Sequence, residues 1–331
     1  MGRKRNSNDA WMPPRVYRGR TSFEYHPKEG GSIQLCPRDS KKSVVWQEYE
    51  KHADTGILTF QRMFEKFKIS PQYNEVSERT QKDYEQYNKY IKPVFGATRP
   101  DKITTPHIRI YMDKRGVKAP VRANKELSFM SKIFNWGKER AYCKSNPCIG
   151  IKRYKTKDRT RYITHAEYKI VYEAASIPVK VAMDISYLCA ARQQDVLSLT
   201  WAQIDDKGIY IKQGKTGKEQ IKLWSQALRD AVQLSKTQPG PKSIKHVIHN
   251  KQGKKYTSDG FRSMWSLAYN AAFGDDKPKD RFTFHDIKAK GVSDYEQGDK
   301  QLFSGHKTRR QVDVYDRKVQ EVDALDPSKN K

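Results

Sequence analysis

The sequence predicts a multidomain, mainly α-helical protein with small β elements, and three observations support this prediction. The chain has 331 residues, enough for two or three domains that each bury a core of their own. Apolar residues recur at helical spacing over most of its length, whereas alternating, β-rich runs occur in only two short stretches. A strongly basic segment separates the helical middle of the chain from its second half.

The composition favours a polyanionic partner, of which nucleic acid is the commonest. The formal net charge is +27 and the isoelectric point is near 9.8, far beyond what solubility requires. A merely basic, solvated surface and a membrane-surface binder remain as alternatives. No apolar run approaches the roughly 20 residues of a membrane span, and residues 1–5 are not followed by an apolar signal core. We therefore expect a cytosolic protein with no membrane partner.

The cysteines and acidic residues favour chemistry without metal or cofactor. Cys143 and Cys148 are spaced too widely for a CxxC zinc knuckle, and Cys36 and Cys189 lie in unrelated contexts. A reducing compartment would keep all four as thiols. No cluster of Asp and Glu stands out as the ligand set of a two-metal nuclease.

The first 55 residues are predicted to form a small sheet backed by one helix. Residues 16–25 are β-rich, residues 28–31 form a turn, and residues 32–35 form a second strand. A helix is expected from Lys42 to His52. Cations cluster where such a ribbon could enter a DNA groove, namely Arg3, Lys4, Arg5, Arg15, Arg18 and Arg20.

Residues 56–151 are predicted to form a helical bundle. Three apolar stripes at helical spacing indicate core rather than base-stacking surface: Phe60, Met63, Phe64 and Phe67; Tyr84, Tyr87, Tyr90 and Ile91; and Leu127, Met130, Ile133, Phe134 and Trp136. A further helix is expected from Thr104 to Asp113, with Thr105-Pro106 in its first turn.

Residues 152–161, KRYKTKDRTR, form a basic linker to the rest of the chain. Such a run is either a solvated connection or a segment that lies along DNA phosphates, and the sequence leaves both open. Its cations are Lys152, Arg153, Lys155, Lys157, Arg159 and Arg161.

Residues 162–331 combine helices with one hairpin. Residues 208–213 and 220–224 alternate as strands around a turn that carries Lys215 and Lys218. Residues 185–199 are predicted to be one apolar helix, interrupted by Arg192 and Asp195. These two charges either form a surface ion pair, or Asp195 orients a guanidinium aimed at phosphate.

Two histidines and a tyrosine follow in polar surroundings. His285 and Lys288, three apart, face the same way at a helix start, with Asp286 available to the helix N-terminus. Gly305-His306 is followed by Tyr315. Each of these residues alone is common on protein surfaces or in cores. The order and spacing of the whole set are what indicate a shared functional site.

This set resembles the tyrosine recombinase (phage integrase) family, in which the pattern runs Arg, hairpin Lys, His-x-x-Arg, Gly-His, and Tyr nine residues after the second His. The matching residues are Arg192, Lys215, His285, Lys288, His306 and Tyr315. The resemblance covers most of the chain and implies an arm-type DNA-binding domain (1–55), a helical core-binding, SAM-like domain (56–151), the linker (152–161), and an α+β catalytic domain with a C-terminal tail (162–331). A lambda-type temperate-phage integrase is the subgroup implied.

The resemblance implies a division of roles around one phenol. Tyr315 would attack the scissile phosphate and form a 3′-phosphotyrosyl link, His285 would assist removal of its proton, and Lys215 would protonate the departing 5′-hydroxyl. Arg192 and Lys288 would hold the nonbridging oxygens, and the second histidine, His306, would hydrogen-bond the phosphoryl group.

The sequence departs from the family pattern in two places. Lys288 stands where the family usually has a second arginine. The lysine keeps the positive charge but lacks the planar guanidinium that can bind two phosphate oxygens at once. Residues 189–191, Cys-Ala-Ala, stand where a Thr-Gly pair and one apolar residue are common, and all three are small.

The implied partners are double-stranded DNA, with core-type and arm-type attachment sites, and three further copies of the chain in a tetramer. A host DNA-bending protein and an excisionase are candidate accessory proteins, and the location would be the nucleoid of a bacterial host. The tail residues Val319, Val322 and Leu325 would pack on a neighbouring subunit or in cis. Two alternatives stay open: a type IB topoisomerase-like relaxase, and a DNA-binding architectural or regulatory protein with a weakened active site.

Overall fold

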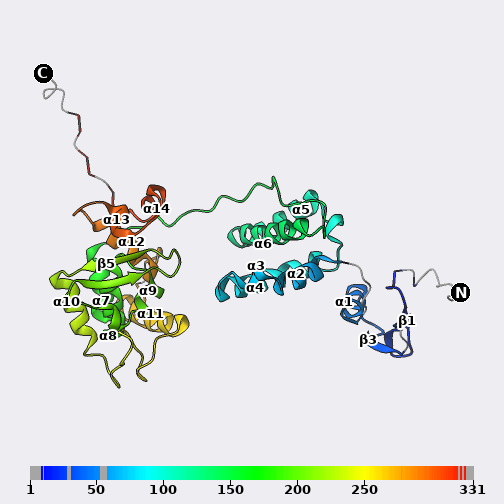
Figure 1. Cartoon of the computed structure of the whole chain (residues 1–331), viewed down its shortest axis with the longest axis horizontal. Helices are drawn as coiled ribbons and strands as arrows, with labels where there is room; N and C mark the ends of the chain where they lie inside the picture. Colours follow the sequence, from blue (N-terminus) through cyan, green and yellow to red (C-terminus); the bar gives the residue numbers. More distant parts are fainter. Residues whose placement is uncertain are drawn as a thin grey trace. The chain divides into compact units, whose positions relative to one another are not determined.

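The computed structural model divides the chain into two compact units, Met1–Lys157 and Asp158–Lys331. It describes residue 9 and residues 11–27, 31–52, 58–276, 278–319, 321–322 and 324–325 (Figure 1). The division falls inside the basic linker. None of the helices in these ranges is long and apolar enough to cross a membrane.

The N-terminal sheet has three antiparallel strands rather than the two that were predicted. Strands β1 (Val16–Arg18), β2 (Ser22–Tyr25) and β3 (Ile33–Pro37) pair in that order, and α1 (Lys42–His52) packs on β2 and β3. The single strand expected over residues 16–25 was wrong, because the chain reverses at Gly19, whose N–H donates to the Ser22 carbonyl at 2.8 Å. The predicted turn at 28–31 lies mostly outside the described residues.

The sheet and α1 share a small core of their own. Val16, Phe23 and Val45 are almost completely buried, and the Tyr25 and Tyr49 rings meet edge to face with their centroids 5.0 Å apart. The helix predicted from Lys42 to His52 is confirmed at both ends.

The predicted bundle contains five α-helices and one 3-10 helix among the described residues. They are α2 (Phe60–Lys68), α3 (Pro71–Asn74), α4 (Glu78–Phe95), η2 (Pro100–Lys102), α5 (Thr105–Gly116) and α6 (Pro120–Glu139). The three predicted stripes are buried, with one exception. Tyr90 is 42% exposed, and the Arg115 guanidinium lies over its ring at 4.0 Å from the centroid.

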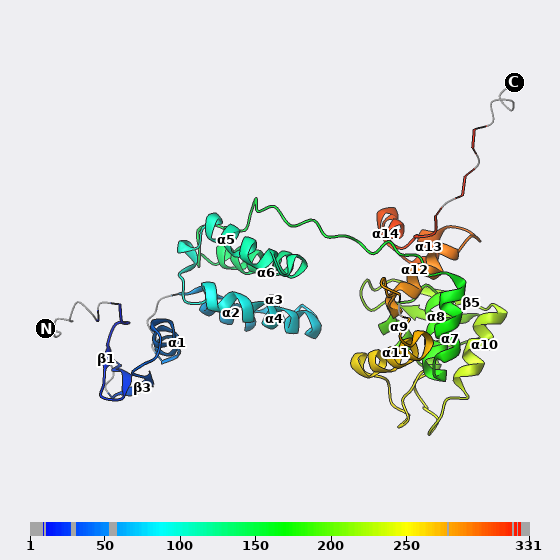
Figure 2. The ribbon, with the colours of Figure 1, turned by 180° about the vertical axis from the view of Figure 1, so that it is seen from behind.

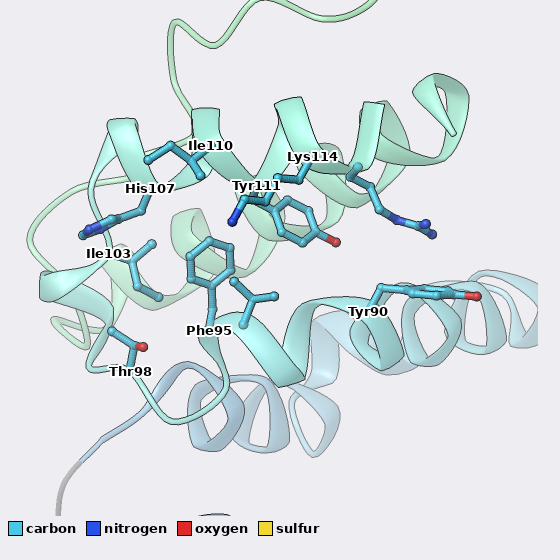
Figure 3. Close-up of a pocket in the computed structure, with 10 residues that line it drawn as sticks. Tyr90, Phe95, Thr98, Ile103, His107, Ile110, Tyr111 and Lys114 are labelled. Atoms are coloured by element: carbon cyan, nitrogen blue, oxygen red, sulfur yellow. The ribbon is translucent and has the colours of Figure 1, made fainter. Parts of the chain in front are cut away.

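A pocket of about 640 Å³ lies between α4 and α5, with Tyr90 on one side and Ile110 and Lys114 on the other (Figure 3). Phe95 and Ile103 contribute apolar surface to it. None of the predicted catalytic or DNA-binding residues lines this pocket.

The second unit is a helical domain with one hairpin. Its elements are α7 (His165–Ala174), α8 (Ile177–Leu188), α9 (Gln193–Leu197), η3 (Trp201–Gln203), β4 (Gly208–Lys212), β5 (Glu219–Leu223), α10 (Gln226–Ser235), α11 (Ser258–Phe273), α12 (Phe284–Asp294), α13 (Lys300–Ser304) and α14 (Arg309–Asp313). Helix α8 packs against α7, α10, α11 and α12. The antiparallel hairpin β4–β5 confirms the strand prediction to within one residue.

Residues 185–199 do not form the single helix that the sequence predicts. Helix α8 ends at Leu188, Ala190 has a φ of 48°, and α9 begins after Arg192. The Ser186 hydroxyl, which donates to the Ala191 carbonyl at 2.9 Å, helps to hold the break. Tertiary contacts therefore override the helix propensity of the alanines. Because of the break, Arg192 occupies the N-cap position of α9 instead of projecting from an apolar stripe.

Helices α12, α13 and α14 lie together at one end of this unit in both views (Figures 1 and 2). A small separate core joins them, made of Ala190, Val292 and Val312 with Phe303 and Tyr315 packed against it. Tyr315 is the second residue after α14, so this core determines where its ring lies.

Candidate active site

The Tyr315 side chain lies among three of the residues predicted to act with it. Its hydroxyl is 3.2 Å from Nε2 of His285, and its ring centroid is 4.7 Å from that of His306. The Lys288 ammonium is 5.6 Å from the same ring centroid. Helix α12, the turn after α13 and the second residue after α14 thus bring one phenol, two imidazoles and an amine together.

Arg192 belongs to the same cluster of charge. Its guanidinium donates to Oε1 of Gln213, and its positive charge contributes to lowering the pKa of Lys288, His285 and His306. Of the two alternatives for Arg192 and Asp195, the surface ion pair does not form. Asp195 instead accepts the Gly214 N–H at 2.9 Å, so both side chains engage the β4–β5 hairpin.

Lys288 is a buried cation whose one hydrogen-bond partner among the described residues is a neutral carbonyl. Only 1% of it is exposed, and its Nζ lies 3.4 Å from the Ser304 carbonyl. Burial, followed by the charges of Arg192 and Lys222, lowers the pKa of Lys288 to about 7. Charged and neutral forms are therefore both populated near neutral pH.

Both histidines are neutral near pH 7. Burial, followed by the charges of Lys288 and Arg192, lowers the pKa of His306 to about 4. Burial also lowers the pKa of His285, with partial compensation by Asp286. A neutral His285 can accept a proton from the phenol 3.2 Å away.

His306 has one ring nitrogen paired and the other unpaired. Ser304 Oγ is 2.8 Å from Nδ1, whereas Nε2 is buried without a partner among the described residues. With the hydroxyl donating to Nδ1, Nε2 carries the hydrogen and is an unsatisfied donor. A phosphoryl oxygen is an acceptor that would satisfy it.

The glycine before His306 is required by both conformation and space. Gly305 ends α13 in the left-handed region at φ 65°. A Cβ there would lie 2.5 Å from Nε2 of Gln213 and 2.6 Å from Oε1 of Gln220. The Gly-His pair can therefore approach the hairpin only without a side chain.

Lys215 is exposed in the turn of the β4–β5 hairpin. Within the described part of the chain its ammonium makes no hydrogen bond or ion pair. The structure thus brings five of the six predicted catalytic residues together and leaves Lys215 at the tip of a hairpin whose base is fixed. Lys290, two residues after Lys288, does not join the cluster, since its ammonium is buried against Asp294 at 2.9 Å and the Ile163 carbonyl at 3.0 Å.

Sequence reasoning missed Gln213, which connects the parts of the site. Its Oε1 accepts from Arg192 and from the Thr216 hydroxyl at 2.9 Å, and its Nε2 donates to the Ser304 carbonyl at 3.0 Å. The sequence signal was a polar residue in register with Ile209 and Ile211, at an inward position of an alternating strand. Lys222 was also missed. It donates to the Phe303 carbonyl, and burial lowers its pKa.

The predicted DNA-binding cations fall into three groups. Arg3, Lys4 and Arg5 lie outside the described residues, whereas Arg15, Arg18 and Arg20 are exposed on the N-terminal ribbon, as are Lys152, Arg153, Lys155 and Lys157 in the linker. Two linker arginines engage carboxylates of the second unit: Arg159 lies 3.0 Å from Asp286, and Arg161 pairs with Glu167. Within the described ranges, no group of three His, Cys, Asp or Glu side chains is arranged to hold a metal ion.

Comparison with known families and proteins agrees with this geometry. The model of the phage integrase family matches residues 154–319, and that of the phage integrase central domain matches residues 60–154. The integrase of Escherichia phage HK022 is 23% identical over 347 positions, which cover 93% of this chain and 94% of that protein. The integrase of Enterobacteria phage 434 is 25% identical over 186 positions, covering 54% and 52%.

Solved structures with a similar fold include two of lambda integrase. A dimer bound to a COC′ core site has a TM-score of 0.69 at 19% identity and covers 98% of this chain and 100% of that one. A tetramer bound to a Holliday junction has the same score and identity and covers 98% and 99%. At this identity the likeness concerns the fold. The family model, in contrast, spans half of the sequence, and the chain therefore belongs to the phage integrase family of tyrosine-type site-specific DNA recombinases.

Proposed function

We propose that the protein integrates and excises phage DNA by cutting and rejoining strands through a 3′-phosphotyrosyl link at Tyr315. The observation that carries this proposal is the 3.2 Å separation between the Tyr315 hydroxyl and Nε2 of a neutral His285. A phenol beside a proton acceptor and within a cationic cluster is an activated nucleophile.

The chemical step exchanges one phosphodiester for another. The phenolic oxygen of Tyr315 bonds to phosphorus as its proton passes to His285, and the bond from phosphorus to the 5′-oxygen breaks. The strand then carries a 3′-phosphotyrosine and a free 5′-hydroxyl. Attack by the 5′-hydroxyl of another strand reverses the step and releases the tyrosine, so no high-energy cofactor is consumed.

Three groups stabilise the charge that develops on the phosphoryl oxygens, and a fourth supplies a proton. Arg192 and Lys288 contribute cations and His306 contributes the N–H at Nε2. Lys215 protonates the departing 5′-oxygen, which requires the hairpin tip to reach the leaving group. The contacts that fix the base of this hairpin through Gln213 support that role.

The division of DNA contacts follows the domains implied by the sequence. Residues 1–55 bind arm-type sites, and residues 56–151 and 162–331 hold the core-type site, with residues 152–161 along the backbone between them. The exposed cations of ribbon and linker support this division. A host DNA-bending protein and an excisionase are the candidate accessory proteins.

Covalent trapping on a nicked core-site duplex is the experiment that tests the proposal. Cleavage next to the nick releases a short fragment, so the 3′-phosphotyrosyl adduct should accumulate. Mass spectrometry of the digested adduct should place the nucleotide on the peptide that contains Tyr315. A duplex attached through its 5′ end, or no adduct at all, would contradict the proposal.

Replacing Gln213 by alanine is expected to slow cleavage about a hundredfold, the cost typical of displacing a reacting group by about 1 Å. The change removes the side-chain oxygen that accepts hydrogen bonds from Arg192 and from the Thr216 hydroxyl in the hairpin turn. Single-turnover cleavage on the nicked duplex measures the effect. Gln226→Ala, at an exposed glutamine on α10, is the matched control. An unchanged rate in Gln213→Ala would rule out the organising role.

The C-terminal tail is proposed to pack on a neighbouring subunit of a tetramer. Val319, Val322 and Leu325 are each at least 80% exposed on the single chain. Burial of apolar side chains of this size would favour association. Truncation after Lys318 should therefore leave single-site cleavage intact but reduce synaptic tetramers in native gels and light scattering. Tetramers that survive the truncation would instead indicate packing in cis.

A further inference from the structure

A buried ion pair joins helix α12, which carries His285, to the segment that follows the proposed nucleophile. An amino group of the Arg317 guanidinium is 2.8 Å from Oδ1 of Asp286, and the two side chains are 6% and 1% exposed. Charges at this depth persist only when they are paired and hydrogen-bonded. Both are: the guanidinium also donates to the Arg161 carbonyl at 3.3 Å, and the carboxylate has further donors.

Each member of the pair lies within two residues of His285 or Tyr315 in the sequence. Asp286 follows His285, and Arg317 lies two residues after Tyr315. Because two residues span at most about 7 Å of backbone, the pairing of Arg317 with Asp286 limits how far the phenol can move from the imidazole.

A second connection joins the same two segments. The Arg317 N–H donates to Ser293 Oγ at 2.7 Å, and that hydroxyl donates to the Tyr315 carbonyl at 3.1 Å. Ser293 is on α12, the helix that begins at Phe284 and carries His285. Nearby, the Lys300 ammonium bridges the Ser293 carbonyl at 3.0 Å and Asp316 at 2.8 Å. The backbone on either side of the nucleophile is thus fastened to one helix.

The acidic partner is itself rigidly held. Oδ2 of Asp286 accepts from the backbone N–H and the hydroxyl of Thr283, both at 2.8 Å, as the capping box of α12. Burial raises the pKa of Asp286, but the hydrogen bonds from Arg317 and Thr283 outweigh it and hold the pKa below its ordinary value. The carboxylate is therefore a fixed, ionised anchor.

We propose that Arg317 is a positioning residue, which through its buried pairing with Asp286 holds the Tyr315 hydroxyl within proton-transfer distance of His285 in the same subunit. This inference rests on the proposed function, in which Tyr315 is the nucleophile. Helix α14 before the tyrosine is only five residues long, and the tail residue Val319 just after it is 84% exposed. The ion pair and the Ser293 bridge therefore add to the packing of Val312 and Tyr315 in holding this short segment on α12.

A role in positioning can be separated from a role in stability by removing the charges one and two at a time. Arg317→Met leaves Asp286 buried beside only an exposed arginine, so it should lower both the melting temperature and the cleavage rate. The double variant Asp286→Asn with Arg317→Met removes both buried charges, and its melting temperature should recover towards that of the wild type. Its single-turnover cleavage at saturating DNA should nevertheless stay about a hundredfold slow.

Two further variants complete the test. Arg317→Lys keeps the charge and should give a rate between those of the wild type and Arg317→Met, with a melting temperature near that of the wild type. Lys318→Gln removes an exposed ion pair with Glu296 one residue further along and should leave the rate unchanged. Affinity for the core duplex should be unchanged in every variant, because Arg317 is almost completely buried.

The outcomes are distinct. A double variant that cleaves at the wild-type rate would overturn the inference and leave the pair as a stabilising contact only. A slow double variant with normal DNA affinity supports it. If the wild-type protein itself forms no adduct, the proposed function fails, whatever the variants do.

Discussion

Tyr315→Phe is expected to bind the core-site duplex with unchanged affinity and to form no covalent adduct with it. The substitution removes one oxygen and keeps the ring that packs against Val312 and Ala190. The cations that would contact the phosphate, Arg192 and Lys288, also remain. Without the phenolic oxygen no bond to phosphorus can form at this position, so the loss should exceed that from removing any single charge-stabilising donor, which is about a hundredfold to a thousandfold.

A nearby tyrosine provides the matched control. The ring of Tyr295 stacks on Phe303 at a centroid distance of 3.9 Å, and phenylalanine would keep that contact. Denaturing gels of the trapping reaction should therefore show the shifted band with the wild type and Tyr295→Phe, and none with Tyr315→Phe. A shifted band that survives in Tyr315→Phe would identify a different nucleophile.

Lys288→Arg is expected to abolish the fall in cleavage that the wild type should show at alkaline pH. The buried lysine has a pKa of about 7, so its cationic form is lost as the pH rises through 7. At subsaturating DNA, cleavage by the wild type should then fall by up to about tenfold per pH unit, because phosphate binding requires the lost proton. An arginine stays charged throughout, so the ratio of variant to wild-type rate should climb with pH.

Stability should change in the opposite direction. Because burial lowers the pKa of Lys288 from 10.5 to about 7, the unfolded state binds more protons between these values. The free energy of unfolding of the wild type should therefore rise with pH across this window. Lys288→Arg should lack this gain and melt below the wild type at pH 9. A rate ratio that is flat with pH, measured in folded protein, would show that Lys288 keeps its proton without DNA.

The elements that local patterns specify were predicted well. Helix α1, the β4–β5 hairpin and the start of α12 follow from apolar periodicity and capping residues close in sequence. The break before Arg192 was not predictable, because alanines favour helix and only packing imposes the positive φ at Ala190. Alternation likewise cannot reveal a reversal inside a β-rich run, which is why β1 and β2 were predicted as one strand.

The site likewise combines residues that local sequence patterns reveal with residues that only tertiary contacts reveal. The spacing of Gly305, His306 and Tyr315 is a local signal, and the residues it nominated lie together in the structure. The role of Gln213 depends on Arg192, 21 residues away, and on Ser304, 91 residues away. The Asp286–Arg317 pair spans 31 residues. Partners at such separations are set by the tertiary fold, so no role was predicted for Gln213 or Arg317, and Asp286 was predicted only to act at the N-terminus of its helix.

The Ser304 carbonyl accepts from both Gln213 and Lys288. For Lys288, this carbonyl oxygen is a weaker hydrogen-bond acceptor than the phosphoryl oxygen that DNA would supply in the same place. For the Lys288 ammonium, exchanging a neutral carbonyl for an anionic phosphate is favourable. Giving up a carboxylate partner would cost more free energy. In the proposed reaction, Lys288 would therefore exchange the Ser304 carbonyl for a phosphoryl oxygen when DNA binds, while Gln213 keeps its own hydrogen bond to that carbonyl.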